Sequence, residues 1–260
     1  MNRLNAPRRQ PAVSRTAGFT LVEMMVAMAI AMIVLLGLSV TFVNLKSTFN
    51  SQDKFAQLQD NERLALSMLT TSLNEAGYWP NPWSMDRAKA LTLSSDPTYG
   101  TMQPGWAVFG QAAVAGPPVV TENLQTAYVS ASGDGVLTCQ GGTNTSGSNG
   151  KIRNVFYVQT DPSTGISSLG CAVLFNDSTT TSPGAAWTPI INNVQSMSVM
   201  YGVDSDGDNL VDKYLGPADV TTQSLWGNVK SAQITLNFTN PYSPGSTIPW
   251  VYTVNLMNNR

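Results

Sequence analysis

A single apolar segment near the N-terminus constrains this chain more than any other feature of its sequence. From Phe19 to Val43 the only charged residue is Glu23. As a helix this segment would be about 37 Å long, which is enough to cross a hydrocarbon core of roughly 30 Å. The residues before it contain four arginines and no acidic residue. Because positive charge is retained on the cytoplasmic side, we expect a single membrane pass with the rest of the chain outside the cytoplasm.

This segment has two ordinary interpretations, a cleaved secretory signal peptide and a plain signal anchor. A cleaved secretory signal peptide fits poorly, because the apolar run is too long and no A-x-A pattern follows it. A plain signal anchor fits the length and the flanking charge, and it stays an alternative. It leaves the carboxylate of Glu23 without a role, although a charge so close to the start of a helix can lie near the membrane interface.

Residues 18–23, with the sequence GFTLVE, resemble the processing site of type IV prepilins and related pseudopilins. The resemblance implies that a prepilin peptidase cleaves between Gly18 and Phe19 and that the new N-terminus at Phe19 is methylated. It also implies that Thr20 and Glu23 serve assembly. The Phe19 amine of one subunit would face Glu23 of its neighbour, and opposite charges about 4 Å apart attract by roughly 4 kcal/mol at an effective dielectric constant near 20.

The helical pattern continues beyond the membrane segment. Apolar residues recur near helical spacing with polar residues between them, at Phe55, Leu58, Ala65, Leu69, Leu73 and Ala76. Gly77 and Pro80 are stop signals for this helix. The predicted parts of the chain are a removed leader at 1–18, a transmembrane or filament-core half of the helix at 19–43, an amphipathic half at 44–77 and an extracytoplasmic β-rich domain at 78–260.

Beyond Pro80 the sequence changes to short alternating apolar segments that are typical of strands. The candidate strands are KALTLSS, WAVFGQ, LQTAYVSAS, RNVFYVQT, GCAVLFN, VQSMSVMYGV, KSAQITLNF and VYTVNLM. TDPSTG at 160–165 predicts a hairpin turn, and CQGGTNTSGSNGK at 139–151 predicts a loop that is mobile apart from its cysteine. The expected fold class is α+β, with a long N-terminal helix packed on an antiparallel β-sheet as in pilins.

Three blocks of the sequence resemble PilW-type minor pilins: LNEAGYWP, NNVQSMSVMYGVDSDGDNLVDKY and VNLMNNR. Residues 84–190 show no such resemblance to a known family. The resemblance implies a structural subunit that is held in the inner membrane, enters the type IV pilus near its tip and helps to initiate assembly. The implied partners are other minor pilins, the major pilin and the prepilin peptidase. Two alternatives stay open: a J-type minor pseudopilin of a type II secretion system, and an adhesin or binding domain anchored by a pilin-like helix.

Composition argues against several other functional classes. Without the four leader arginines the formal charge of the chain is about −6, which argues against a nucleic-acid-binding surface. The chain has no histidine, which excludes a Ser-His-Asp triad, a Cys-His pair and a His-ligated zinc site, so we expect no enzymatic activity. Trp79, Trp83 and Trp106 fit either an adhesive surface or half-buried core positions.

The two cysteines, Cys139 and Cys171, predict a disulfide. An even pair of cysteines in an oxidising compartment is most simply explained by one bridge. A reactive thiol would need an activating partner, and the chain has no histidine to serve as one.

The segment VDSDGDNLVDKY predicts a calcium loop. Its ligands would be the Leu210 backbone carbonyl and the carboxylates of Asp204, Asp206, Asp208 and Asp212. Oxygen donors at alternate positions suit a hard cation such as Ca²⁺. Asn209 and Leu215 stand where an EF-hand has its glycine and its bidentate glutamate, so the loop departs from that motif and predicts weak binding. A solvated acidic turn is the alternative.

Overall fold

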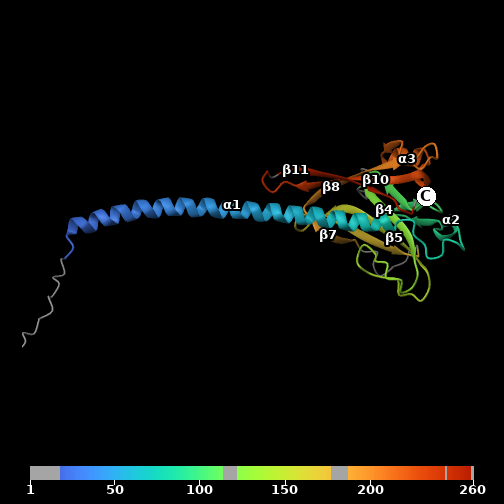
Figure 1. Ribbon diagram of the computed structural model, residues 1–260, viewed down its shortest axis with the longest axis horizontal. Coiled ribbons are helices and arrows are strands. Elements are labelled where there is room, and N and C mark those ends of the chain that lie inside the picture. The colour runs from blue at the N-terminus through green and yellow to red at the C-terminus, as the bar shows by residue number, and fades with distance from the viewer. Residues whose placement is uncertain (1–17, 114–121, 177–186, 244, 259–260) are drawn as a thin grey trace, which may run out of the picture. The chain divides into compact units, whose positions relative to one another are not determined.

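The computed structural model describes residues 18–113, 122–176, 187–243 and 245–258. The chain forms two compact units, Met1–Gln52 and Asp53–Arg260. One helix, α1 (Leu21–Glu75), supplies its first part to the first unit and its second part to the second unit (Figure 1). The predicted domain boundaries within this helix stay predictions.

In the first unit, every described residue from 18 to 50 is exposed. Among the described residues, α1 is the one helix that is long and apolar enough to cross a membrane, judged by length and composition. A helix that is apolar on all sides is the form expected of a segment whose partners are lipid or other helices.

In the second unit, α1 buries one face against the sheets. Its buried residues are Leu58, Ala65, Leu69, Ser72 and Leu73. The predicted amphipathic pattern is therefore confirmed, except at Phe55, which is 45% exposed and precedes the first buried residue of the helix. The helix ends as predicted: Gly77 has φ +80°, a left-handed conformation common just after a helix, and its N–H donates to the Ala127 carbonyl at 2.8 Å.

A five-stranded antiparallel sheet has the order β3-β4-β5-β6-β7. Its strands are β3 (Val108–Gln111), β4 (Asn123–Ser130), β5 (Gly150–Thr160), β6 (Ser167–Phe175) and β7 (Thr188–Asn192). The predicted hairpin turn between β5 and β6 is confirmed. There the Asp161 carboxylate accepts the Ser163 N–H at 2.8 Å, and the Asp161 N–H donates to the Ile166 carbonyl at 3.0 Å.

A four-stranded antiparallel sheet has the order β11-β10-β8-β9. Its strands are β8 (Val194–Val203), β9 (Lys213–Leu215), β10 (Val229–Thr239) and β11 (Thr247–Asn255). Between β9 and β10 the chain forms α3 (Pro217–Thr222) and the 3-10 helix η1 (Trp226–Asn228). One hydrophobic core joins the buried face of α1 to both sheets. The α+β class is confirmed, with two main sheets where one was expected.

The predicted strand KALTLSS, residues 89–95, is wrong. Its first residues complete the short helix α2 (Arg87–Ala90), in which the Ala90 N–H donates to the Asp86 carbonyl at 3.0 Å. The last ones begin β1 (Ser94–Asp96), which pairs with β2 (Gly100–Met102) in a separate two-stranded sheet. A short alternating segment suits a helical turn as well as a strand, so tertiary contacts decide between them. The short strands β2, β7 and β9 were not predicted.

Candidate functional site

The start of α1 is closed by a reciprocal pair of hydrogen bonds between Thr20 and Glu23. The Thr20 N–H and hydroxyl both donate to Glu23 Oε2 at 3.1 Å. In return, the Glu23 N–H donates to Thr20 Oγ1 at 3.3 Å. This arrangement is a capping box, which satisfies backbone N–H groups that the first turn of a helix leaves without partners.

The capping box gives Glu23 a partner inside its own chain. The pattern T-x-x-E at residues 20–23 is its sequence signal, and it was not part of the prediction. Gly18 and Phe19 lie before the first helical residue, and Phe19 is 88% exposed. The bond predicted to be cleaved therefore lies in non-helical chain beside the cap.

The acidic loop after β8 brings three of its predicted ligands together. Oxygen atoms of Asp204, Asp206 and Asp208 lie within 4.8 Å of one another. Asp204 is buried, at 3% exposure, whereas Asp206 and Asp208 are exposed. Three converging carboxylates form a donor set made only of oxygen, and such a set can hold a hard cation.

Backbone N–H groups and one lysine already contact the Asp204 carboxylate. The Gly207 and Asn209 N–H groups donate to it at 2.6 and 2.9 Å. Lys230 Nζ lies 3.9 Å from Asp204 Oδ2. Burial alone would raise the pKa of Asp204, but the hydrogen bonds from Gly207 and Asn209 and the charge of Lys230 hold this pKa below its usual range. Asp204 therefore stays ionised, while both of its carboxylate oxygens already accept backbone N–H groups.

Of the other two predicted ligands, Asp212 lies outside this group and the Leu210 carbonyl stays a prediction. Asp212 is not part of the triad, and its Oδ2 accepts the Ser205 N–H at 2.6 Å. Leu210 projects a side chain that is 67% exposed, while its N–H donates to Asp208 Oδ1 at 2.7 Å. Lys230 was not predicted as a neighbour of the loop, because its place depends on the pairing of β10 with β8 and no local pattern signals it.

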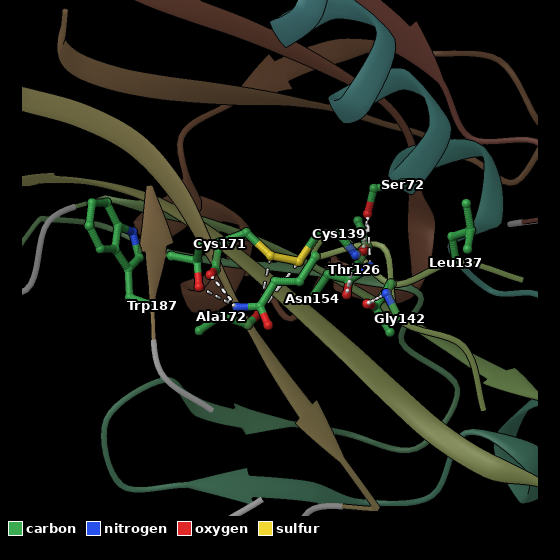
Figure 2. The surroundings of a disulfide bond; sticks show 12 residues. Ser72, Thr126, Leu137, Cys139, Gly142, Asn154, Cys171, Ala172 and Trp187 are labelled. Carbon is green, nitrogen blue, oxygen red and sulfur yellow. Dashed lines mark hydrogen bonds between the residues drawn. A yellow bond between two sulfur atoms is a disulfide. The ribbon is translucent and has the colours of Figure 1, made fainter. Parts of the chain in front are cut away.

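The predicted disulfide between Cys139 and Cys171 is confirmed (Figure 2). It joins the loop after β4 to the middle of β6, with the two Cα atoms 6.4 Å apart. Cys171 is fully buried. The neighbouring Gln140 reinforces the bridge, because its Nε2 donates to the Cys171 carbonyl at 3.0 Å and to Thr188 Oγ1 at 3.2 Å.

Beside the disulfide, a buried polar network connects α1 to the sheet (Figure 2). The hydroxyls of Ser72 on α1 and Thr126 on β4 are 2.7 Å apart. Asn154 on β5 donates from Nδ2 to Ser72 Oγ at 3.2 Å, and its Oδ1 accepts the Cys139 N–H at 3.2 Å. A buried network whose members find partners favours one register of the helix on the sheet over alternatives.

The Gly/Ser/Asn-rich loop at 139–151 is more tightly held than expected. Asn144 is 1% exposed, and its Nδ2 donates to the carbonyls of Ser130 and Ser148 at 2.7 and 2.8 Å. Its Oδ1 accepts the Ser146 N–H at 3.0 Å. One buried amide thus supplies bonds that composition alone did not indicate.

Two comparisons with known families agree with this arrangement. The family described as Type IV Pilus-assembly protein W matches residues 155–248, which run from β5 into β11 and include the acidic loop. The family described as Prokaryotic N-terminal methylation motif matches residues 13–39, which include the capping box. The chain thus matches the PilW family of type IV pilus assembly proteins over residues 155–248 and carries the N-terminal methylation motif. No match to a curated protein was found.

The match to the PilW family has consequences for several predictions. The family is one of pilus assembly and is typically structural rather than enzymatic. It implies pilus components as partners and processing by the prepilin peptidase. The methylation motif and the long apolar helix are consistent with a membrane-anchored prepilin. The match from residue 155 also covers part of the 84–190 stretch for which the sequence offered no resemblance.

Proposed function

We propose that this PilW-family chain is a minor pilin that helps to initiate type IV pilus assembly and lies near the pilus tip. The observation that carries the proposal is that the methylation motif and the PilW match occur on one chain, with the motif at the start of an exposed apolar helix. The PilW match favours the pilus over the type II secretion alternative. The chain would leave the inner membrane only after cleavage between Gly18 and Phe19, with the globular unit on the extracytoplasmic side.

Deleting the gene tests this proposal. We expect surface pili and twitching motility to be lost while type II secretion continues, with both restored by the wild-type gene. Loss of secretion with normal piliation would instead favour the pseudopilin alternative. Tip location is tested separately by labelling the globular unit on intact pili, where label along the whole shaft would contradict it.

Glu23 allows the roles of its charge and of its cap to be separated. Glu23→Gln keeps a side chain that can complete a capping box but removes the charge, whereas Glu23→Ala removes both. We expect mass spectrometry to show cleavage after Gly18 in both variants. We also expect both to enter pili at least tenfold less than wild type, because the Phe19 amine of the neighbour loses an attraction of roughly 4 kcal/mol before solvent screening.

Normal incorporation of Glu23→Gln together with failure of Glu23→Ala would show that the cap, and not the charge, serves assembly. Thr20→Ser is the matched control, since serine retains a capping hydroxyl and should assemble as wild type. An intact leader on the wild-type chain in cells that contain the peptidase would contradict the processing site itself.

We also propose that Asp204, Asp206 and Asp208 hold one Ca²⁺, with Asp212 and the Leu210 carbonyl as further donors. What supports this is the convergence of three carboxylates, all of them hard oxygen donors. Two features weaken the site: the N–H groups that already occupy the Asp204 oxygens, and the positive charge of Lys230 beside them. We therefore expect a dissociation constant on the order of 10⁻⁴ M, as in extracellular calcium modules.

Calcium at about 100 times that constant should raise the free energy of unfolding by roughly 2.7 kcal/mol. The melting temperature of the detergent-solubilised chain is followed during a calcium titration. The variant Asp206→Asn/Asp208→Asn should lose the response, whereas Asp219→Asn on α3 should keep it. A wild-type melting temperature that ignores 10 mM calcium, or a loop variant that responds as wild type, would reduce this loop to an acidic turn.

A further inference from the structure

The loop that follows α1 displays one tryptophan to solvent. Trp83 is 84% exposed, whereas Trp79 and Trp106 are half-buried and pack against the core. The sequence left the placement of these three residues open, and the structure separates them. An indole ring combines a large apolar area with a polar N–H, so an exposed one offers a ligand both kinds of contact.

The backbone around Trp83 is held in place. Pro80 and Pro82 restrict the loop by sequence. The Ser84 N–H and hydroxyl both donate to the Asn81 carbonyl, at 3.2 and 3.1 Å. Trp79 Nε1 donates to the Met85 carbonyl at 3.0 Å. The indole of Trp83 is therefore displayed on a stiff support, which lowers the entropy lost when a ligand packs on it.

A cleft of about 310 Å³ opens beside this loop. Its lining combines amide and hydroxyl groups with the aromatic ring of Trp79, and it comprises Trp79, Pro80, Asn81, Ser84, Met85, Lys89, Ala90, Val129, Asn149, Lys151 and Asn176. The volume lies at the lower end of the range for small-molecule sites. Its lining residues Lys89 and Ala90 belong to α2, which lies at one end of the globular unit (Figure 1).

The charge of the lining is positive in a chain of negative net charge. The charged residues among the described lining residues are Lys89 and Lys151. Lys151 has a structural role, because its Nζ donates to Thr92 Oγ1 and to the carbonyls of Thr92 and Leu93 at 3.0–3.1 Å. Lys89 lies exposed on α2. Two positive charges beside neutral donors favour a ligand that is polar and anionic.

We propose that this cleft and Trp83 bind an acidic saccharide. A sugar ring has an apolar C–H face that suits the indole of Trp83, and hydroxyls that suit Asn81, Ser84 and Asn149. A carboxylate or sulfate on the sugar would approach Lys89. This binding role is separate from assembly, because it uses the end of the globular unit and none of the residues at the start of α1.

Isothermal titration calorimetry on the full chain in detergent tests the proposal, with hexagalacturonate as the probe. EDTA is present so that calcium at the acidic loop does not bridge to the carboxylates. We expect saturable binding that weakens about tenfold in Trp83→Ala, as for a central aromatic contact, and severalfold in Lys89→Gln. Maltohexaose, which has no charge, should bind at least tenfold less tightly than hexagalacturonate.

Tyr242→Ala is the matched control, because Tyr242 is an exposed aromatic residue, 54% exposed, in the turn between β10 and β11. It should bind hexagalacturonate as wild type. The melting temperatures of all variants are compared, and Lys89→Gln provides a second test if Trp83→Ala is unstable. The absence of binding by the wild type, equal binding of maltohexaose, or equal loss in Tyr242→Ala would each overturn the proposal. The proposal would also be overturned if Trp83→Ala assembled pili poorly while the wild type bound no saccharide. The loop would then be a contact with another protein.

Discussion

Replacing Gly110 by alanine is expected to lower the free energy of unfolding by about 3 kcal/mol, the upper end of the usual cost of overpacking a core. A Cβ atom at this position would overlap the Tyr201 hydroxyl and lie 2.9 Å from Tyr201 Cζ and 3.0 Å from the Asn123 carbonyl. Tyr201 cannot withdraw easily, because it is fully buried and its ring packs edge-on against Trp226 at 4.7 Å. Urea unfolding of both proteins measures the loss.

A second variant shows whether the Tyr201 hydroxyl is the cause. Among the described residues this buried hydroxyl has no hydrogen-bond partner, so Tyr201→Phe should be neutral or stabilising by up to about 1 kcal/mol. In Gly110→Ala/Tyr201→Phe, removal of the overlapping oxygen should recover about 1–2 kcal/mol. The control is Tyr252→Phe, which removes another partnerless buried hydroxyl and should combine additively with Gly110→Ala. If the changes in the free energy of unfolding were additive both for Gly110→Ala with Tyr201→Phe and for Gly110→Ala with Tyr252→Phe, the overlap at Tyr201 would be contradicted.

Reduction of the Cys139–Cys171 disulfide is expected to have an effect of similar size. The bridge joins residues 32 apart in sequence, and a loop of this length stabilises a fold by about 3–4 kcal/mol in the chain-entropy model. For a domain of this size the melting temperature should fall by roughly 10 °C. Differential scanning calorimetry with and without reductant measures the change.

A bridge-free variant separates loss of the crosslink from side effects of the reductant. Cys139→Ala/Cys171→Ala should melt near the reduced wild type and should not respond to reductant. Denatured wild-type protein from an oxidising compartment should show no titratable thiol before reduction. A melting temperature that does not change on reduction would contradict a stabilising bridge.

The acidic loop shows what a local sequence pattern can predict and what it cannot. The spacing of aspartates predicted a cluster of carboxylates, and three of them do converge. The sequence did not indicate that Asp212 would turn to the Ser205 N–H, or that Lys230 would lie beside Asp204. Both outcomes depend on the paths of backbone and strands that meet at the loop, so no spacing rule within the loop could predict them.

The features that could be predicted from the sequence are those that depend on residues close together in the chain. The apolar run, the stop at Gly77, the hairpin turn at Asp161 and the cap between Thr20 and Glu23 all arise within a few residues, where periodicity and side-chain chemistry decide the outcome. Most strands were predictable for the same reason, because alternation is a local pattern.

Contacts between groups far apart in the chain could not be predicted and follow from the folded structure. The division into two sheets, the helical turn at α2, the close approach of Gly110 to Tyr201 and the network from Ser72 to Cys139 each join segments far apart in the chain. So does the cleft beside Trp83, which combines residues from the loop after α1, from α2, from β4 and β5 and from the chain just after β6. Such contacts follow from how the elements pack around one core, and their free energy depends on all partners together.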